Sequence, residues 1–140
     1  FKEVINEVKA DINHDISESN ASIIENLEVE NINYPHKHLR SIIYNLISNA
    51  IKYRSPDRTP KVEVRTRKVG KKIQLSIIDN GLGLEDGQVK KIFKMFKRLH
   101  THVEGSGVGL YIVKRIVENN GGNISVESIP GKGTSFLIVF

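Results

Sequence analysis

Two asparagines and a lysine recur at helical spacing in residues 36–53, HKHLRSIIYNLISNAIKY. At about 100° per residue, Asn45, Asn49 and Lys52 share one side of the predicted helix with Ser41. Asparagine is a poor residue for a helix interior, so two of them on one face are unexpected on a merely solvated surface. Amide oxygens are ligands that Mg²⁺ accepts beside phosphate oxygens and water. The stripe therefore predicts one wall of a phosphate–Mg²⁺ pocket, with a solvated face as the alternative.

An aspartate stands at the end of a predicted strand, in IQLSIIDNGLGL (73–84). Asp79 is followed by Asn80 and Gly81, which is favourable turn chemistry, so an Asx-type turn explains it without a ligand. A carboxylate fixed at a strand end can also accept a hydrogen bond from an exocyclic amine such as that of adenine. Both interpretations remain open on this motif alone.

A glycine-rich segment, GSGVGL (105–110), precedes a predicted helix over 108–119. The free N–H groups and the positive dipole end of a helix N-terminus favour a bound anion. The spacing matches neither the Walker P-loop, which requires a Gly-Lys-Ser/Thr, nor the dinucleotide fingerprint, which follows a strand directly. The segment indicates a phosphate site only together with the two preceding motifs.

The elements that must position these residues alternate between helices and strands. Helices are expected at 1–19, 36–53 and 108–119, the second with an apolar side made of Leu39, Ile43, Leu46, Ile47 and Ala50. Residues 21–33 predict a strand, a turn and a short strand. Hairpins are expected at 61–79 and 121–140, and residues 80–107 are expected to form a loop with a short helix near 87–98. This order predicts an α+β fold, a two-layer sandwich of a mostly antiparallel sheet with three helices on one face.

Composition is that of one globular domain of 140 residues, 39% hydrophobic and 26% charged. The absence of cysteine excludes disulfide scaffolds, thiolate zinc sites and cysteine nucleophiles, and it suits a cytoplasmic compartment. No apolar run reaches the ~18 residues of a membrane span. Because the chain starts at Phe1, we expect a fragment of a longer protein, with any membrane attachment through that parent. The net charge of +5 fits a solvated surface or a face for nucleotide phosphates or nucleic acid.

Five blocks in this order resemble the ATP-binding catalytic domain of bacterial sensor histidine kinases. This family shares a superfamily with gyrase, mismatch-repair and chaperone ATPases. The blocks are HLRSIIYNLISNAIKY (38–53), DNGLGL (79–84), IFKMFKRLH (92–100), EGSGVGLYIVKRIVENNGG (104–122) and PGKGTSF (130–136). The resemblance implies a Bergerat-type ATP-binding fold over 1–140, with a mobile ATP lid at about 85–107.

The resemblance also implies a role for each matching residue. Asn49 corresponds to the Mg²⁺ ligand with Asn45 beside it, and Lys52 and Arg98 would touch phosphates; these four form the expected catalytic set. Asp79 would hold the adenine amine, with Thr134 helping through water, and Tyr53 would stack near the base. The remaining expected nucleotide-binding residues are Gly81, Gly83, Leu84, Gly105, Ser106, Gly107, Val108, Gly109 and Leu110.

The implied function is phosphoryl transfer rather than hydrolysis. Sister ATPases carry a glutamate at the position of Asn45 to activate water, and an amide cannot take that proton. The expected acceptor is a histidine on a dimerisation and phosphoacceptor domain of the parent, because none of the five histidines here lies in the family's acceptor motif. ATP, ADP and a downstream response regulator are the other expected partners; nucleic acid is not. A regulatory nucleotide-binding scaffold and an ATP-hydrolysing relative remain as alternatives.

Overall fold

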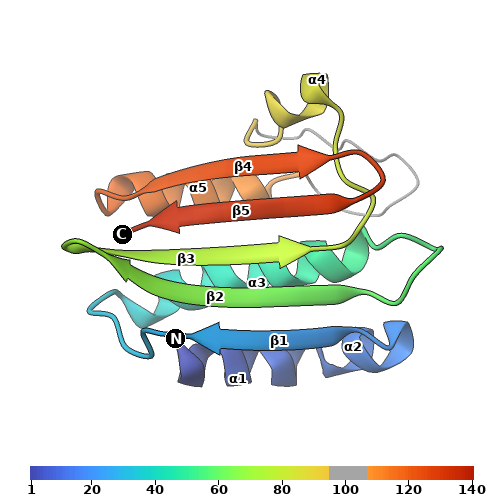
Figure 1. The fold of residues 1–140 in the computed structure, drawn as a ribbon. Coiled ribbons are helices and arrows are strands. Elements are labelled where there is room, and N and C mark those ends of the chain that lie inside the picture. The colour runs from blue at the N-terminus through green and yellow to red at the C-terminus, as the bar shows by residue number, and fades with distance from the viewer. Residues whose placement is uncertain (95–106) are drawn as a thin grey trace.

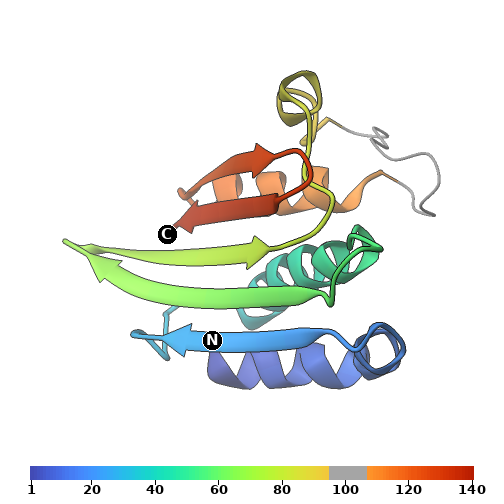
Figure 2. The ribbon, with the colours of Figure 1, turned by 45° about the vertical axis from the view of Figure 1, so that its right-hand side comes forward.

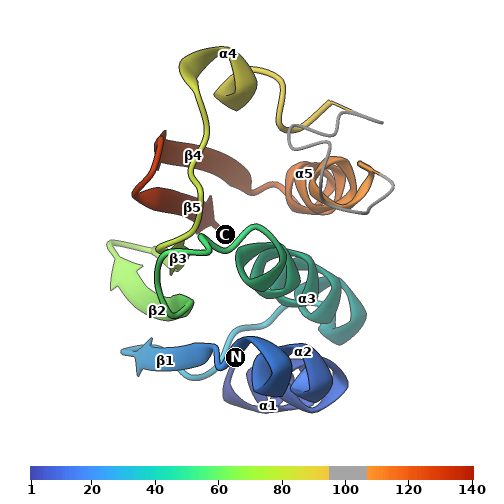
Figure 3. The same cartoon turned by 90° about the vertical axis from the view of Figure 1, so that its right-hand side faces the viewer.

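The computed structural model describes residues 1–94 and 107–140. These residues form two layers, a sheet and a set of helices packed on one of its faces (Figures 1 and 3). The five strands lie in the order β1-β2-β3-β5-β4. Their bounds are β1 (Ser22–Leu27), β2 (Lys61–Val69), β3 (Lys72–Asp79), β4 (Asn123–Ile129) and β5 (Gly133–Val139). β1 pairs with β2 in parallel and the other pairs are antiparallel, which confirms the predicted α+β class and mixed sheet.

The helices of the second layer are α1 (Lys2–Asp11), α2 (Asn13–Ser19), α3 (His36–Lys52) and α5 (Gly109–Asn119). A short α4 (Asp86–Val89) stands apart from them, beside the edge of β4 (Figure 3). The expected single helix over 1–19 is divided, because Ile12 leaves helical geometry with φ −102° and ψ 19°. The predicted number of three helices on one face is therefore not confirmed. Within the described ranges, no helix is long and apolar enough to cross a membrane.

The core lies between the two layers and follows the alternation of the sequence. Strands β2, β3 and β5 turn their buried positions toward α1, α3 and α5, while the intervening positions face away from the helices. Burial of these apolar side chains is the main stabilising term of the fold. Among the described residues, the hydrophobic side chains exposed by less than 2% are Ile5, Val8, Ile42, Ile43, Leu46, Ile47, Val62, Val64, Leu75, Ile77, Val113, Val117 and Ile138.

Two predicted elements are wrong in detail. The expected short strand after β1 is absent from residues 28–33. There the backbone of Val29 is hydrogen-bonded by the Thr66 side chain and not by the backbone of a neighbouring strand. Its hydroxyl donates to the carbonyl oxygen of Val29 at 2.6 Å and accepts from the Val29 N–H at 3.1 Å. The expected helix near 87–98 is only the single turn of α4 followed by turns to residue 94, and its last residues lie outside the described part of the chain.

The topology gathers four segments at one end of the sandwich. The C-terminal end of α3, the N-terminal end of α5, the end of β3 and the turn between β4 and β5 lie there together (Figure 2). These segments carry the three sequence motifs and the last glycine block. The fold therefore brings together residues that are as far apart in sequence as Asp79 and Thr134.

Candidate functional site

Asp79 is the last residue of β3, and its side chain closes the turn that follows the strand. Oδ1 accepts hydrogen bonds from the backbone N–H of Gly81 at 2.8 Å and of Thr134 at 3.3 Å. The first bond is the Asx-type turn that the sequence predicts. The second comes from β5, so the carboxyl also joins the two neighbouring strands. The Asx-turn and ligand interpretations are thus compatible, since the turn occupies one oxygen.

The other carboxyl oxygen of Asp79 has no hydrogen-bond partner among the described residues. Burial raises the pKa of Asp79 to about 6, and the N–H donors of Gly81 and Thr134 oppose part of this shift. Asp79 is half-buried, and a carboxyl oxygen shielded from water without a donor is costly, so it is expected to serve a ligand or a catalytic step. The chemistry that fits it is a hydrogen-bond donor such as an amino group.

The raised pKa of this half-buried carboxyl predicts that Asp79→Asn stabilises the nucleotide-free chain at high pH. Because the pKa of Asp79 is higher in the folded chain than in the unfolded chain, the protonated carboxyl of the wild type stabilises the folded chain in full below about pH 4. The wild type loses this contribution as the pH rises through about 6. The asparagine is neutral throughout, so its free energy of unfolding should exceed that of the wild type by about 1–3 kcal/mol at pH 8. Urea unfolding at pH 4.5 and pH 8 measures this gap.

The exposed Asp57, in the loop before β2, provides the control. Asp57→Asn, a substitution in an exposed loop, should change the free energy of unfolding at pH 8 by no more than about 0.5 kcal/mol. A constant difference between Asp79→Asn and the wild type at both pH values would contradict the assignment of the shifted pKa to Asp79.

The turn after β3 interlocks with the β4–β5 turn. Gly133, at φ 134°, lies so close to the Asp79 carbonyl oxygen that a Cβ there would overlap it, and Gly83 approaches the carbonyl of Ile129 in the same way. The Gly131 N–H donates to the Leu82 carbonyl at 2.7 Å. These close approaches explain the glycines of both blocks, because any side chain at Gly133 or Gly83 would push the turns apart.

The end of α3 is fastened to the same turn. The Leu82 N–H donates to the carbonyl oxygen of Tyr53 at 3.0 Å, and Gly81 lies against that same carbonyl. The Lys52 ammonium lies 6.0 Å from the centre of the Tyr53 ring. The predicted pair Lys52–Tyr53 is thus next to the Asp79 turn.

The polar stripe of α3 does not face open solvent. Asn45 and Asn49 are half-buried, whereas the neighbouring Tyr44 is exposed, with 40% of its surface accessible. Asn45 donates from Nδ2 to the Ser41 carbonyl at 2.7 Å, and its Oδ1 lies where a side chain at Gly109 would be. The stripe is therefore turned toward the first residue of α5. Glycine at that position lets the helix start approach Asn45.

The N-terminus of α5 completes the arrangement within the described residues. Val108 is the N-cap and makes no side-chain capping bond, so the first N–H groups of the helix have no partner within it. Gly107 has φ 69°, a left-handed conformation that glycine adopts without strain. Leu84 is buried, and Leu110 is half-buried against the core. Of the other predicted site residues, Arg98, Gly105 and Ser106 lie outside the described part of the chain.

Two residues near Asp79 were not predicted from the sequence. Ser128 accepts from the Leu84 N–H at 2.9 Å, donates to the Gly133 carbonyl at 3.0 Å and bonds to the Thr134 hydroxyl at 2.9 Å. The feature that could have indicated Ser128 is a serine on the same face of β4 as the apolar residues Ile124 and Val126. Arg58 bonds to three backbone carbonyls of the two turns, and its loop sequence SPDRTP gives no sign of this.

The donor set at this end of the sandwich fits a magnesium ion that arrives with a phosphate ligand. Among the described residues, no cluster of histidine, cysteine or carboxylate side chains could hold a metal by itself. The half-buried amide of Asn49 makes no side-chain hydrogen bond with any described residue. Mg²⁺ keeps most of its ligands as water and phosphate oxygens, so one amide oxygen suits it.

Comparison with known proteins identifies the family that the chain resembles. A family model described as histidine kinase-, DNA gyrase B-, and HSP90-like ATPase matches residues 35–140. Sensor protein RprX of Bacteroides fragilis is 39% identical over 125 residues, which cover 85% of this chain and 24% of RprX. Phytochrome-like protein Cph1 of Synechocystis is 34% identical over 137 residues, covering 96% of this chain and 18% of Cph1. The chain thus spans a quarter or less of these relatives.

Solved structures share the fold over nearly the whole chain. The mycobacterial sensor histidine kinase MprB matches with a TM-score of 0.84 at 26% identity, covering 99% of this chain and 92% of that one. The histidine kinase ThkA, in a structure in complex with the response regulator protein TrrA, matches with a TM-score of 0.78 at 22% identity. That match covers 100% of this chain and 40% of ThkA, and at this identity it shows the fold.

Proposed function

The chain belongs to the family of histidine kinase-, DNA gyrase B-, and HSP90-like ATPases, and we propose that it binds ATP with Mg²⁺ for phosphoryl transfer. In this proposal it positions the γ-phosphate for a histidine on a separate dimerisation and phosphoacceptor domain of the parent protein. The named relatives and structural neighbours are sensor proteins and histidine kinases, which supports a role in two-component signalling.

The observation that carries the proposal is the open carboxyl oxygen of Asp79. One oxygen is occupied by the Gly81 and Thr134 N–H groups, and the other has no donor within the described residues. The exocyclic amine of adenine would supply that donor. We assign the adenine end of the nucleotide to Asp79, Gly81 and Thr134, with Tyr53 stacking beside the base.

The phosphate end is assigned to the α3 stripe and the start of α5. The first N–H groups of α5, which have no partner within the helix, and the helix dipole favour a polyphosphate there, and Lys52 adds a positive charge. Asn49, with Asn45 beside it, would hold Mg²⁺, which would neutralise phosphate charge. We also assign Arg98, Gly105 and Ser106 to the phosphates on the resemblance alone.

Transfer is favoured over hydrolysis by the amide of Asn45. Its Nδ2 donates to the Ser41 carbonyl, and an amide has no basic site to deprotonate a water molecule. In transfer, an imidazole nitrogen of the acceptor histidine forms a bond to the γ-phosphorus. The bond from that phosphorus to the oxygen bridging to the β-phosphate breaks, and ADP leaves with that oxygen. The role left to this chain is positioning and charge neutralisation.

The proposal places the acceptor outside the described histidines. His14 and His36 are exposed, and His36 pairs with Glu7 at 3.1 Å. His38 is half-buried beside the Tyr34 ring and the Asn120 amide. His100 and His102 lie outside the described residues. We therefore look for the acceptor in the parent protein, in the cytoplasm, with a response regulator as the next partner.

Labelling with γ-³²P-ATP tests the proposal. The chain alone, with Mg²⁺, should bind ATP without acquiring acid-labile phosphate. Adding the separately produced phosphoacceptor domain of the parent should give label on a histidine of that domain. Label on His14 of the chain would contradict the proposal. ATP binding without any transfer to the added domain would favour the regulatory scaffold instead.

A further inference from the structure

Arg58 joins the two turns that surround Asp79, although it lies in neither. It belongs to the loop between α3 and β2. Its Nε donates to the Asn80 carbonyl at 2.6 Å, and its Nη2 donates to the carbonyls of Gly81 at 3.0 Å and Gly131 at 2.5 Å. Hydrogen bonds from a charged guanidinium are among the stronger ones in proteins, and its planar shape fixes their directions.

The same loop holds Asn80 from further directions. The Asn80 side chain donates to the Thr59 carbonyl at 3.0 Å and accepts from the Lys61 N–H at 2.8 Å. Asn80 follows Asp79 directly, and Gly81 supplies the N–H bonded to the Asp79 carboxyl. The position of the carboxyl therefore depends on a loop that does not touch it.

We propose that Arg58 is a positioning residue that sets the preference of the site for adenine, by holding the turns at residues 79–84 and 129–134 together. The inference rests on the proposed nucleotide site. The hydrogen bonds of Arg58 hold the turn that follows Asp79 against the turn that leads into Thr134. Without them, the open carboxyl oxygen would no longer be held where an adenine amine meets it. Contacts to the phosphates, which the proposed function assigns to α3 and α5, would be unaffected.

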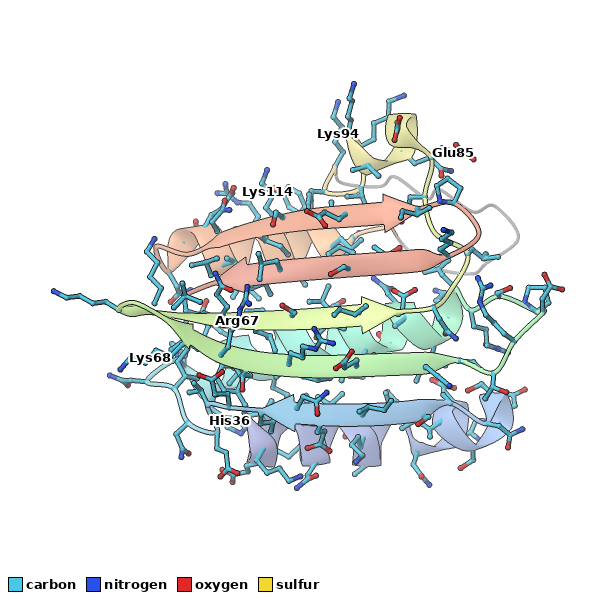
Figure 4. The ribbon with its side chains drawn as sticks, viewed as in Figure 1. His36, Arg67, Lys68, Glu85, Lys94 and Lys114 are labelled. Carbon is cyan, nitrogen blue, oxygen red and sulfur yellow. The ribbon has the colours of Figure 1, made fainter. Side chains whose placement is uncertain are left out.

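Comparing ADP with IDP separates this role from general structural support. IDP has the same ribose and diphosphate but carries an oxygen in place of the exocyclic amine. The variants are Arg58→Ala, Arg58→Lys and the control Arg67→Ala. Arg67 is an exposed arginine of β2, labelled in Figure 4, and it bonds to Gln74 of β3 at 2.8 Å. In the strand register Arg67 pairs with Gln74, whereas Asp79 pairs with Val62 near the other end of β2.

Titration calorimetry of the 140-residue chain should show that the wild type prefers ADP to IDP. Arg58→Ala should weaken ADP binding roughly tenfold, the scale of one lost charge-assisted hydrogen bond, with IDP binding unchanged within about twofold. Arg58→Lys should fall between, because an ammonium cannot reach all three carbonyls, and Arg67→Ala should match the wild type. Equal losses for ADP and IDP would overturn the proposal, as would wild-type ADP affinity in Arg58→Ala.

Hydrogen exchange of the nucleotide-free chain gives an independent measurement. The bonded amides of Gly81 and Gly131 should exchange faster in Arg58→Ala than in the wild type or Arg67→Ala. Unchanged exchange at both amides would overturn the positioning role whatever the nucleotide does. If the wild type bound ADP no better than IDP, the proposed adenine site would be refuted. Faster exchange of the Gly81 and Gly131 amides in Arg58→Ala would still show that Arg58 restrains the two turns.

Discussion

Replacing Asp79 by asparagine is expected to lower the affinity for ADP by at least about 100-fold. This is the combined scale of losing a hydrogen bond to a charged carboxylate and of placing the asparagine N–H donor against the adenine amine, which is also a donor. The amide oxygen of the introduced side chain would keep the bonds from the Gly81 and Thr134 N–H groups. The amide nitrogen would then occupy the open position, where it cannot accept from an adenine amine. Titration calorimetry with ADP at pH 8 measures the loss.

The stability of the same variant excludes unfolding as the cause. Because burial raises the pKa of the Asp79 carboxyl to about 6, the nucleotide-free variant should be more stable than the wild type at this pH. A gain in stability with a loss of binding is typical of a binding residue held in an unfavourable environment. Asp57→Asn, in the exposed loop, should bind ADP normally. Unchanged ADP affinity in Asp79→Asn would contradict the assignment of Asp79 to the base.

The second large effect is expected at Asn49. Asn49→Ala should lower the rate of phosphoryl transfer to the phosphoacceptor domain by at least about 100-fold, because charge neutralisation of the phosphates is worth several kcal/mol. ADP affinity measured in EDTA should change little, since the base and its turn are untouched. The transfer rate comes from the ³²P assay, and the affinities come from calorimetry with and without Mg²⁺.

A matched asparagine distinguishes this role from a loss of helix stability. Asn119 is exposed at the last residue of α5, so Asn119→Ala should retain both transfer and magnesium dependence. If Asn49→Ala kept the wild-type transfer rate and the same gain in affinity from Mg²⁺, the magnesium site would have to be assigned elsewhere.

The layers and most of the elements could be predicted from the sequence because each has a strong local signal. The alternation of 61–79 and 121–140 indicated both hairpins, and in the structure Gly70 has a φ of 60° in the first turn. The stripe of α3 was recognisable because two asparagines in a helix interior are unusual. Asp79 was predicted as a turn residue and as a ligand residue, and its two oxygens serve the two roles separately in the proposed site.

The features that could not be predicted depend on contacts between distant segments. Arg58 looked like any charged residue of a proline-bounded loop, and its three acceptors are backbone carbonyls that have no residue signature. The missing strand after β1 has the same origin, because the side chain of Thr66, on β2, forms hydrogen bonds with both the N–H and the carbonyl of Val29. The direction of the α3 stripe also depends on where α5 begins, which the helix's own periodicity does not contain.

A crystal structure of the chain with ADP and Mg²⁺ tests the central claim most directly. We expect the adenine amine within hydrogen-bond distance of the Asp79 carboxyl oxygen that is not bonded to Gly81. The diphosphate should lie at the start of α5, with the metal on the Asn49 amide oxygen. A nucleotide bound with its base away from Asp79, or with its phosphates away from α3 and α5, would contradict the account.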